Sequence, residues 1–401
     1  MVKTIPGREV NMVKKKTFEE TYPTNEKYQR FDQRNTSFQQ KRRSTGSLLD
    51  YNTDEYKADK IRKNVPGFGV VDYAFKQAAG MYEGMPGGDD GMSQGYYSWT
   101  PLGVGSLPKG VPKWSGTPEK AAKIITKAAK YFGAVGVGFC PLDERWIYSH
   151  TNDGKEIVIE EAEAPYINDK KAVIPKSHKW VIAMVVPMEH KENSYAPTAI
   201  EVTSNMGYSR MHILSGYVAE FIRALGYSAI PMGNDTALSV PIALQAGLGH
   251  MGRHGRLITW DHGPLVRICK IFTDLPLPQS PPAPSGIIEY CEVCGRCAKK
   301  CPSESITPGP RTWEGPNSSN NNGSYKWYND EDKCLRYWNE VGSGCSICFR
   351  VCAFTKEKAP LHDLVKWILR RTSLFNRPFV VMDELMGYGN IPDPRKYWDE
   401  P

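Results

Sequence analysis

The chain has 401 residues, of which 40% are hydrophobic and 11% aromatic, so it can bury a core and is too apolar for a disordered protein. No apolar run reaches the roughly 18 residues of a membrane-spanning helix; the longest is VIAMVVPM at 181–188. Residues 1–65 contribute +6 of the net charge of +7, from 15 Lys and Arg against 9 Asp and Glu. Because no nucleic-acid motif accompanies this charge, we expect no nucleic-acid partner. A solvated arm lying over the protein is preferred to contact with an anionic membrane surface.

The elements predicted along the chain alternate between helices and strands. Residues 66–116, rich in Gly, Pro and aromatic residues, predict irregular, loop-dominated chain. A helix follows over 117–133, with Thr117 as its N-cap and Gly133 as its stop. Strands are predicted at 134–139, 179–186, 227–232, 256–260 and 266–274, and helices at 208–226 and 240–247. This order indicates an α/β core that ends near residue 275, at the proline-rich linker LPLPQSPPAPSG.

Eight of the ten cysteines lie in two runs after this linker. The first run, CEVCGRCAKKCP, has the C-x2-C-x2-C-x3-C-P spacing of bacterial ferredoxins, which bind [4Fe–4S] clusters. The second run is stretched, with one cysteine far ahead of a C-x2-C-x3-C group. In two-cluster ferredoxins the fourth cysteine of a run ligates the other cluster. The prediction is therefore that cluster 1 is held by Cys291, Cys294, Cys297 and Cys352, and cluster 2 by Cys301, Cys334, Cys345 and Cys348.

Disulfides and zinc are the two other uses of clustered cysteines. Disulfides suit oxidising compartments and small chains with little core. Zinc-binding C-x2-C pairs rarely form a triple that is followed by Cys-Pro. Cys140 and Cys269 stand alone in apolar segments and are predicted to be buried structural thiols. Because two clusters form an electron relay and not an active site, the function depends on the domain that they serve.

The segment GLGHMG at 247–252 matches the G-x-G-x-x-G pattern of dinucleotide-binding proteins. That pattern requires a strand before it and a helix after it, whereas here the predicted order is reversed. NAD binding is therefore not predicted. Gly247, Gly249 and Gly252 instead indicate a close approach of the backbone to a bulky group, such as the phosphate or ribose of a cofactor tail.

With these pieces in order, the chain resembles the catalytic subunits of respiratory reductive dehalogenases. The resemblance rests on GNDTALSVPIALQAGLGHMGR, VRICKIFTDLPL and the two cysteine runs, and it covers roughly residues 117–355. It implies an α/β (α+β) fold, in which a nitroreductase-like cobalamin-binding core precedes a two-cluster ferredoxin-like domain. Four regions follow: a basic, aromatic- and Gly-rich region covering the core (1–116), the core (117–275), the ferredoxin-like domain (276–360) and a C-terminal extension (361–401).

The resemblance also implies a catalytic pair, a tyrosine and a basic residue about sixty positions apart. Tyr208 and Arg267 match this pair, and Asn234 matches an asparagine near the substrate and the corrin ring. The rival tyrosine, Tyr217, lies in the middle of the predicted helix, where packing explains it more simply.

The substrate pocket and the corrinoid are implied in the same way. Trp338 matches an aromatic residue that lines the substrate pocket, and Tyr97 and Trp99 are further candidates; packing beside the nearby cluster is the other explanation for Trp338. The corrinoid is expected base-off, without a protein ligand below cobalt. This agrees with WDHGP at 260–264, which does not match the cobalt-ligating motif D-x-H-x-x-G.

The implied function is reductive dehalogenation in organohalide respiration. A halogen of an organohalide is replaced by hydrogen, with two electrons relayed by the clusters to cob(I)alamin and a proton from Tyr208. A neighbouring guanidinium favours tyrosinate and so makes proton donation easier. The implied partners are the organohalide, a small integral-membrane anchor protein and an upstream electron donor, and a homodimer is compatible with them.

The family's location is implied as well. Its members are exported folded by the twin-arginine route and lie on the outer face of the cytoplasmic membrane. Here QKRRSTGSLLD at 40–50 lacks the apolar stretch of such a signal, so we expect a processed, signal-free chain.

Two other functions stay open from the sequence. Epoxyqueuosine reductase, a tRNA-modifying enzyme, has a related core and cluster pair but typically a helical-repeat tail, whereas about fifty residues follow Cys352 here. A non-catalytic electron-transfer subunit would leave the residues before the cysteine runs without a role. The corrinoid content of the reconstituted protein separates that subunit from both enzymes.

Overall fold

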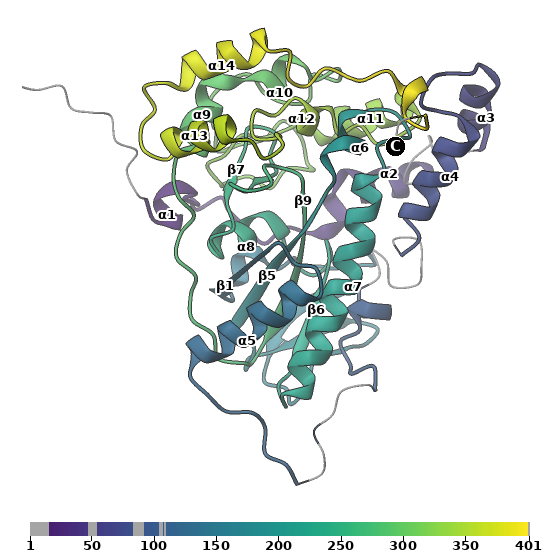
Figure 1. Ribbon diagram of the computed structural model, residues 1–401. Helices are drawn as coiled ribbons and strands as arrows, with labels where there is room; N and C mark the ends of the chain where they lie inside the picture. The colour runs from purple at the N-terminus through teal and green to yellow at the C-terminus, as the bar shows by residue number, and fades with distance from the viewer. Residues whose placement is uncertain (1–15, 47–53, 83–91, 104–106, 108–109, 400–401) are drawn as a thin grey trace, which may run out of the picture.

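The computed structural model describes residues 16–46, 54–82, 92–103, 107 and 110–399 (Figure 1). Three sheets have the strand orders β1-β5-β9-β6, β2-β4-β3 and β7-β8. The strands are β1 Gly136–Pro141, β2 Glu156–Glu160, β3 Tyr166–Ile167, β4 Lys171–Pro175, β5 Trp180–Pro187, β6 Ala229–Met232, β7 His250–Met251, β8 Leu257–Ile258 and β9 Val266–Thr273.

The α-helices of the described residues lie before, between and after these strands. They are α1 Phe18–Thr21, α2 Ser37–Thr45, α3 Asp54–Arg62, α4 Val70–Ala79, α5 Pro118–Tyr131, α6 His190–Ser194, α7 Thr203–Ala224, α8 Ser239–Gln245, α9 Ile287–Cys294, α10 Arg296–Lys299, α11 Glu331–Val341, α12 Ile347–Arg350, α13 Pro360–Leu369 and α14 Asn376–Leu385.

The four-stranded sheet is the middle layer of the α/β core, and its neighbouring strands all pair antiparallel. Because successive side chains of a strand point to opposite faces, β5 contributes to two hydrophobic layers. Ile182 and Met184 pack with α5 and α7, whereas Val181 and Ala183 pack with α8 and the β2-β4-β3 sheet. Figure 1 shows α5 and α7 crossing one face of the sheet.

The elements predicted for the core are present, with shifted bounds. Helix α5 begins as predicted, since the Thr117 side chain accepts a hydrogen bond from the backbone N–H of Lys120. The helix predicted to begin at Tyr208 begins five residues earlier, at Thr203, because polar Ser204 and Asn205 hide its first turn in the sequence. The strand predicted over 256–260 is reduced to β8.

The prediction of loop-dominated chain over 66–116 is wrong for Val70–Ala79, which forms α4. Its N-cap is Gly69, which offers no side-chain cap, so the usual start signal is absent from the sequence. Tertiary contacts stabilise the helix instead: Phe75 packs edge to face on Trp398, and the Asp72 side chain accepts a hydrogen bond from the Trp398 indole. The stretch 83–91, part of the same prediction, lies outside the described residues.

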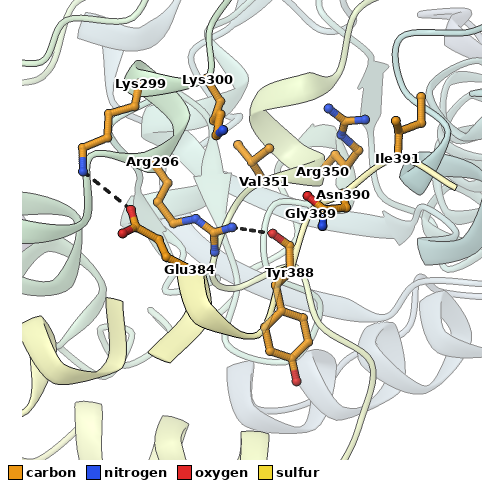
Figure 2. A pocket seen from close by; sticks show the side chains of 11 residues that line it. Arg296, Lys299, Lys300, Arg350, Val351, Glu384, Tyr388, Gly389, Asn390 and Ile391 are labelled. Atoms are coloured by element: carbon orange, nitrogen blue, oxygen red, sulfur yellow. Dashed lines mark hydrogen bonds and ion pairs between the residues drawn. The ribbon is translucent and has the colours of Figure 1, made fainter. Parts of the chain in front are cut away.

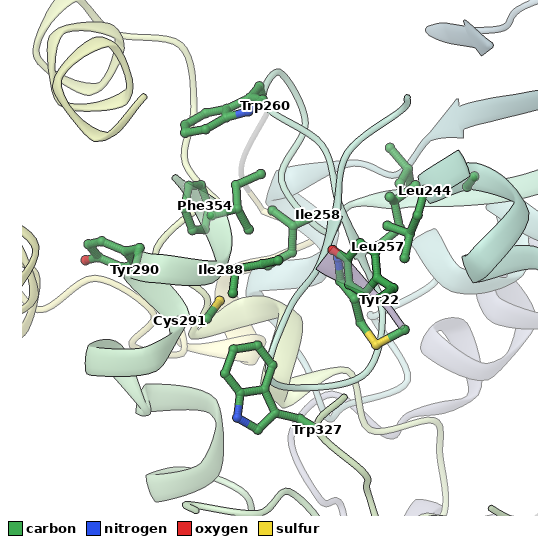
Figure 3. Packing of buried hydrophobic residues seen from close by; sticks show 14 of the residues in the cluster. Tyr22, Leu244, Leu257, Ile258, Trp260, Ile288, Tyr290, Cys291, Trp327 and Phe354 are labelled. Atoms are coloured by element: carbon green, nitrogen blue, oxygen red, sulfur yellow. The ribbon is translucent and has the colours of Figure 1, made fainter. Parts of the chain in front are cut away.

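The cysteine-bearing helices α9 to α12 form a second body above the core, and α13 and α14 cover it (Figure 1). Its junction with the core is apolar: Leu257 and Ile258 of β8 pack in one cluster with Ile288 and Cys291 of α9 and with Phe354 (Figure 3). The C-terminal extension belongs to this body, because Leu369 and Val380 pack in the same cluster.

The described part of the basic N-terminal region lies across both bodies. The Arg30 guanidinium donates to the backbone carbonyls of Ile147, Tyr148 and Ile157 in the core. Phe38 of α2 packs edge to face on Trp338 of α11, with ring centroids 5.7 Å apart. Residues 1–15 and 47–53, including the end of the QKRRSTGSLLD segment, lie outside the described residues. Among the described helices, none combines the length and the apolar character that crossing a membrane requires.

Candidate active site and cluster sites

The cysteines predicted for cluster 1 line one small cavity. Cys291 and Cys294 lie on α9, Cys297 on α10 and Cys352 just after α12, and all four face this space together with Arg253, His254, Tyr290 and Phe354. Gly295 joins α9 to α10 with a φ of 61°, a left-handed conformation that glycine adopts without strain. Local chain geometry therefore gathers three thiols, and the fold adds the fourth from the second run.

The cysteines predicted for cluster 2 also form a set. Burial, and then the neighbouring charges of Cys348 and Cys301, raise the pKa of Cys345 to about 12. Burial likewise raises the pKa of Cys334, with further contributions from Glu331 and Cys348. Cys301, Cys345 and Cys348 pack in one apolar cluster, which also contains Cys297 of the first set. The charge of Cys348 acts on Cys334 as well.

Both sets fit clusters better than they fit disulfides or single metal ions. All ten cysteines lie in described residues and are free thiols. No three His, Cys, Asp or Glu side chains in the described part lie close enough to hold one metal ion. A [4Fe–4S] cluster spaces its ligands more widely, since each thiolate binds a different iron. Burial raises the pKa of Cys291 to about 12 and that of Cys348 to about 11, so a cation such as iron is needed to hold them as thiolates.

Two arginines after the GLGHMG segment link the core to the cluster sites. The Arg253 guanidinium donates to the carbonyl of Cys291 at 3.1 and 3.2 Å and to that of Thr307 at 3.1 Å. Arg256 forms a two-point ion pair with Glu331, both contacts at 3.0 Å, and its charge acts on Cys348. The sequence analysis missed both residues; the signal was their position at the end of the resemblance segment.

The three residues predicted to be catalytic meet at one place, although they come from three elements. Tyr208 lies in the second turn of α7, Arg267 near the start of β9, and Asn234 in the turn between β6 and α8. The Arg267 guanidinium stands over the Tyr208 ring, 4.6 Å from its centroid. The Asn234 amide donates to the Tyr208 hydroxyl oxygen at 3.3 Å. Tyr208 therefore faces β9 and the turn, and does not project off a helix end as its predicted position at the helix start suggested.

Close packing of helix α7 on β9 depends on Gly207. A Cβ at this position would lie 2.7 Å from Cγ of Arg267 and 3.3 Å from Cγ of Met188, both closer than normal contacts. The missing side chain leaves room for the Arg267 stem, whose guanidinium then reaches the Tyr208 ring. The sequence analysis missed this role, because a glycine inside a helix gives no sign of what it contacts.

A buried polar group fixes the turn that presents Asn234. Asp235 is buried and accepts hydrogen bonds from the Gly233 N–H and the Thr236 hydroxyl, both at 2.8 Å. Burial raises the pKa of its carboxyl, while the charge of Lys270 opposes that shift. The Lys270 ammonium is fully buried and donates to the Gly233 carbonyl and, at 2.9 Å, to the Ser239 hydroxyl. The signal for Lys270 was a lysine inside the apolar run VRICKIFT.

One aromatic residue lies between this trio and the cluster 2 cysteines. Phe349 directly follows Cys348, and its ring centroid is 6.0 Å from the Arg267 guanidinium. Phe349 also packs edge to face on His254 at 5.6 Å and in one small apolar cluster with Met188 and Leu265. A continuous chain of contacts therefore runs from Cys348 through Phe349 and Arg267 to Tyr208.

The other aromatic candidates lie around this region in different ways. Tyr97 is fully buried and packs edge to face on His212, with ring centroids 4.3 Å apart. The hydroxyl end of Tyr97 lies against Gly233, the residue before Asn234. Trp99 is buried in the layer of the core that contains α8. Trp338 is half-buried on α11, against Phe38.

The rival tyrosine, Tyr217, is 46% exposed and packs on Tyr96 and Phe132. These neighbours give it a packing role on the outer side of α7, as the sequence analysis favoured.

The predicted cofactor-tail glycines contact the chain itself. A Cβ at Gly247 or Gly249 would lie 2.1 Å from the carbonyl oxygen of Pro281 or Ile258, and one at Gly252 would lie 2.5 Å from the Ile258 side chain. These contacts alone explain why glycine is needed, and the cofactor role stays a prediction. Helix α8 precedes the segment, β7 lies within it and β8 follows it, so the order is the reverse of the one that dinucleotide binding requires. Cys140 and Cys269 are buried, and burial raises the pKa of each to about 12, in keeping with structural thiols.

Three buried polar atoms, one in the trio and two beside the cysteine-bearing segments, fit the edge of a corrinoid. In the described part of the chain, Arg267 Nε, His254 Nε2 and Trp338 Nε1 are buried without a hydrogen-bond partner. Arg267 and His254 border Phe349, and Trp338 lies four residues after Cys334. A corrin ring carries amide groups around its edge and would supply such partners, so these residues are candidates to hold it.

Comparisons with known proteins agree with this geometry. The family model "Reductive dehalogenase subunit" matches residues 43–157, and "4Fe-4S double cluster binding domain" matches residues 290–355. The chain is 35% identical over 317 residues to the tetrachloroethene reductive dehalogenase of Sulfurospirillum multivorans, covering 75% of this chain and 62% of that protein. A tetrachloroethene reductive dehalogenase of Desulfitobacterium hafniense is 33% identical over 336 residues, covering 76% and 60%.

The solved structure of the catabolic reductive dehalogenase NpRdhA has the same fold, with a TM-score of 0.65 at 21% identity. The match covers 95% of this chain and 49% of that one. The prediction of an α/β core followed by a two-cluster domain is thereby confirmed. An epoxyqueuosine reductase of Cellulophaga algicola is 21% identical over 276 residues, a more distant match. The chain spans about 60% of the length of the curated dehalogenases it matches, and it belongs to the reductive dehalogenase family.

Proposed function

We propose that this chain catalyses reductive dehalogenation, using a corrinoid, two [4Fe–4S] clusters and Tyr208 as the proton donor. The observation that carries the proposal is the trio itself: Tyr208 beneath the Arg267 guanidinium, with its hydroxyl bonded to Asn234, one aromatic ring away from Cys348. Two relatives are named for tetrachloroethene, so chlorinated ethenes are the first substrates to test.

The reaction consumes two electrons and one proton: the organohalide R–X becomes R–H, and halide leaves. A bound corrinoid supplies the strong two-electron reductant for the carbon–halogen bond. Tyr208 donates the proton from its hydroxyl and is left as tyrosinate. The Arg267 guanidinium, 4.6 Å from the ring centroid, stabilises that anion. The Asn234 amide orients the Tyr208 oxygen through the bond that it donates.

The two cysteine sets support an electron route to this site. We assign cluster 1 to Cys291, Cys294, Cys297 and Cys352, which line one cavity, and cluster 2 to Cys301, Cys334, Cys345 and Cys348. Cluster 2 is the exit toward the substrate, since Phe349 joins Cys348 to Arg267. A base-off corrinoid belongs to the same proposal, because WDHGP offers no D-x-H-x-x-G ligand.

Organohalide respiration would place the protein at a membrane surface. Export, attachment to a small membrane anchor protein and supply by an upstream donor are proposed on the family resemblance. Recovery of the native protein in the membrane fraction, and its release by salt or mild detergent, is the expected result. Recovery in the cytosol would contradict this part of the proposal and leave the catalytic part standing.

Anaerobic reconstitution tests the catalytic proposal. The chain is loaded with cobalamin, iron and sulfide, and halide release is measured with chlorinated ethenes, alkanes and phenols. We expect about eight irons and about one corrinoid per chain, with halide release from at least one class. The matched control is the chain without cobalamin. Loaded protein that releases no halide but reduces epoxyqueuosine in a tRNA stem-loop would replace this function with the alternative.

A further inference from the structure

A recess of about 560 Å³ opens between the two cysteine runs and the chain after α14 (Figure 2). Helix α10 and the residue after it contribute Arg296, Lys299 and Lys300. Arg350 and Val351 come from the second cysteine run, and Glu384 with residues 387–391 forms the remaining wall. The recess thus lies where both ligand-bearing runs reach the surface.

The lining of this recess is strongly basic. Cationic side chains of Lys299, Lys300 and Arg350 line it, against the carboxylate of Glu384, while the charge of Arg296 is offset by Asp383. The Lys299–Glu384 contact of 3.6 Å joins side chains that are 66% and 49% exposed, so it neutralises little charge. Within the described part of the chain, Arg350 Nε and Nη1 are buried without a hydrogen-bond partner. The charge that an anionic partner can reach is therefore that of the exposed Lys299 and Lys300 at the rim.

The wall around Arg296 is rigid. Arg296 pairs with the buried Asp383 at 3.1 Å and donates to the Tyr388 carbonyl, and Asp383 also binds Lys356. These contacts fix the chain after α14 against the first cysteine run. Lys299 and Lys300, by contrast, are exposed and extend the positive charge outward.

The recess adjoins cluster 1 through Arg296, and its residues Arg350 and Val351 lie beside the cysteines of cluster 2. Arg296 lines both the recess and the small cavity of Cys291, Cys294, Cys297 and Cys352. Cluster 2 reaches the trio through Phe349. A surface that shares a wall with the cluster 1 cysteines is suited to electron entry into the relay.

We propose that this basic recess is the docking site of an acidic one-electron carrier protein, which reduces cluster 1. The inference rests on the proposed function and names the partner that supplies its electrons. At each encounter one electron passes from the reduced carrier to the oxidised cluster, and the carrier leaves oxidised by one electron. Two encounters provide the two electrons that one dehalogenation consumes. Opposite charges on the two surfaces accelerate association, as is typical of transient redox partners.

Stopped-flow reduction of the cluster-loaded chain tests this docking site. The probe is reduced flavodoxin, an acidic protein, and the readout is the bleaching of the iron–sulfur absorption, which requires neither corrinoid nor organohalide. We expect Lys299→Glu/Lys300→Glu to lower the second-order rate constant about 10-fold or more at low salt. The difference should shrink as salt rises, because salt screens exposed charges. Reduction by the methyl viologen radical cation, which the basic recess repels, should not slow.

The matched control is Lys123→Glu/Lys127→Glu on α5, two exposed lysines on the far side of the core from the cluster body. It changes the net charge equally and should have a much smaller effect. Equal slowing in this control, or unchanged flavodoxin kinetics in Lys299→Glu/Lys300→Glu, would overturn the docking site. So would loss of binding to phosphatidylglycerol vesicles together with unchanged flavodoxin kinetics, which would assign the recess to a lipid surface. Failure to release halide would count against the proposed function alone.

Discussion

The two functional regions of the molecule assemble their residues in opposite ways. In the cluster body, three thiols of the first set lie within seven residues of chain, on α9 and α10. In the α/β core, Tyr208, Asn234 and Arg267 come from a helix, a turn and a strand that meet only in the folded protein. Spacing in the sequence therefore encodes the first site, whereas packing encodes the second.

The two regions also differ in what holds them together. The sheet of the core lies between two extensive apolar layers, which include α5 and α7 on one side and α8 on the other. Between the two cysteine sets, the apolar packing is small and consists mainly of Ile306, Ile347 and Val351 beside the cysteines. We infer that iron stabilises the cluster body and that hydrophobic burial stabilises the core.

Removing iron is the strongest test of this contrast. Helices α10 and α12 have only four residues each, too few to be stable without tertiary support. In the chelator-treated chain we expect backbone amides of 287–301 and 345–352 to exchange at least about 100-fold faster, an opening of the kind seen when a metal is lost from a small site. Amides of β5 and β9 should be unchanged. Hydrogen exchange by mass spectrometry measures both, and equal loss of protection in the two regions would refute the contrast.

Tyr208→Phe should give the next largest effect and tests the core site alone. The change removes the hydroxyl that accepts from Asn234 but keeps the ring beneath Arg267. We expect halide release to fall by about 100-fold or more, as for loss of a general acid, with iron and corrinoid contents unchanged. The control is Tyr217→Phe, since Tyr217 packs on Tyr96 and Phe132 on the outer side of α7. A large loss in Tyr217→Phe with normal turnover in Tyr208→Phe would show that the wrong tyrosine has been assigned.

Gly207→Ala probes how closely packing controls the site. The new Cβ would lie 2.7 Å from Cγ of Arg267, so the arginine must shift and its guanidinium moves off the Tyr208 ring. Because alanine favours a helix over glycine, the helix itself is not weakened. We expect about a 10-fold loss of halide release, from a misplaced catalytic group.

Gly216→Ala is the matched control on the same helix, where the new Cβ would meet Tyr96 and not Arg267. It should retain most of the activity. Equal losses of halide release in the two variants would mean that an added side chain anywhere on α7 disturbs the site. Gly207 would then have no special role.

The same contrast explains which parts of the fold and of the site can be predicted from the sequence. The ferredoxin spacing predicted that Cys291, Cys294 and Cys297 lie together, because ligands so close in sequence need little tertiary information. The fourth ligand of each set comes from the other run and depends on the fold. The strands and helices of the core were also predictable, since burial on one face leaves a periodic apolar pattern. Within the site, Tyr208, Asn234 and Arg267 were found by family resemblance alone, as no local pattern joins them.

The residues that sequence reasoning missed act through tertiary contacts. Lys270 and Asp235 hold the turn of Asn234, and Gly207 makes room for Arg267. Arg253 binds the carbonyl of Cys291, which lies 38 residues further along the chain. A glycine in a helix or an arginine in a loop has many common uses, so only its folded neighbours identify its role. Helix α4 was missed for a related reason, since contacts with Trp398 replace the absent cap.

Trp338→Phe is expected to have the smallest effect. It tests whether Trp338 lines the substrate pocket or only packs beside cluster 2. Trp338 lies on α11 of the cluster body, packs on Phe38, and has its indole nitrogen buried without a hydrogen-bond partner in the described part of the chain. If it also lines the substrate pocket, phenylalanine keeps the aromatic packing but leaves a smaller surface for the organohalide. We expect KM to rise about threefold with kcat unchanged, the pattern of a residue that binds substrate and transition state equally. Iron content should stay normal. An unchanged KM with loss of iron would make Trp338 a packing residue of cluster 2 and remove it from the substrate pocket.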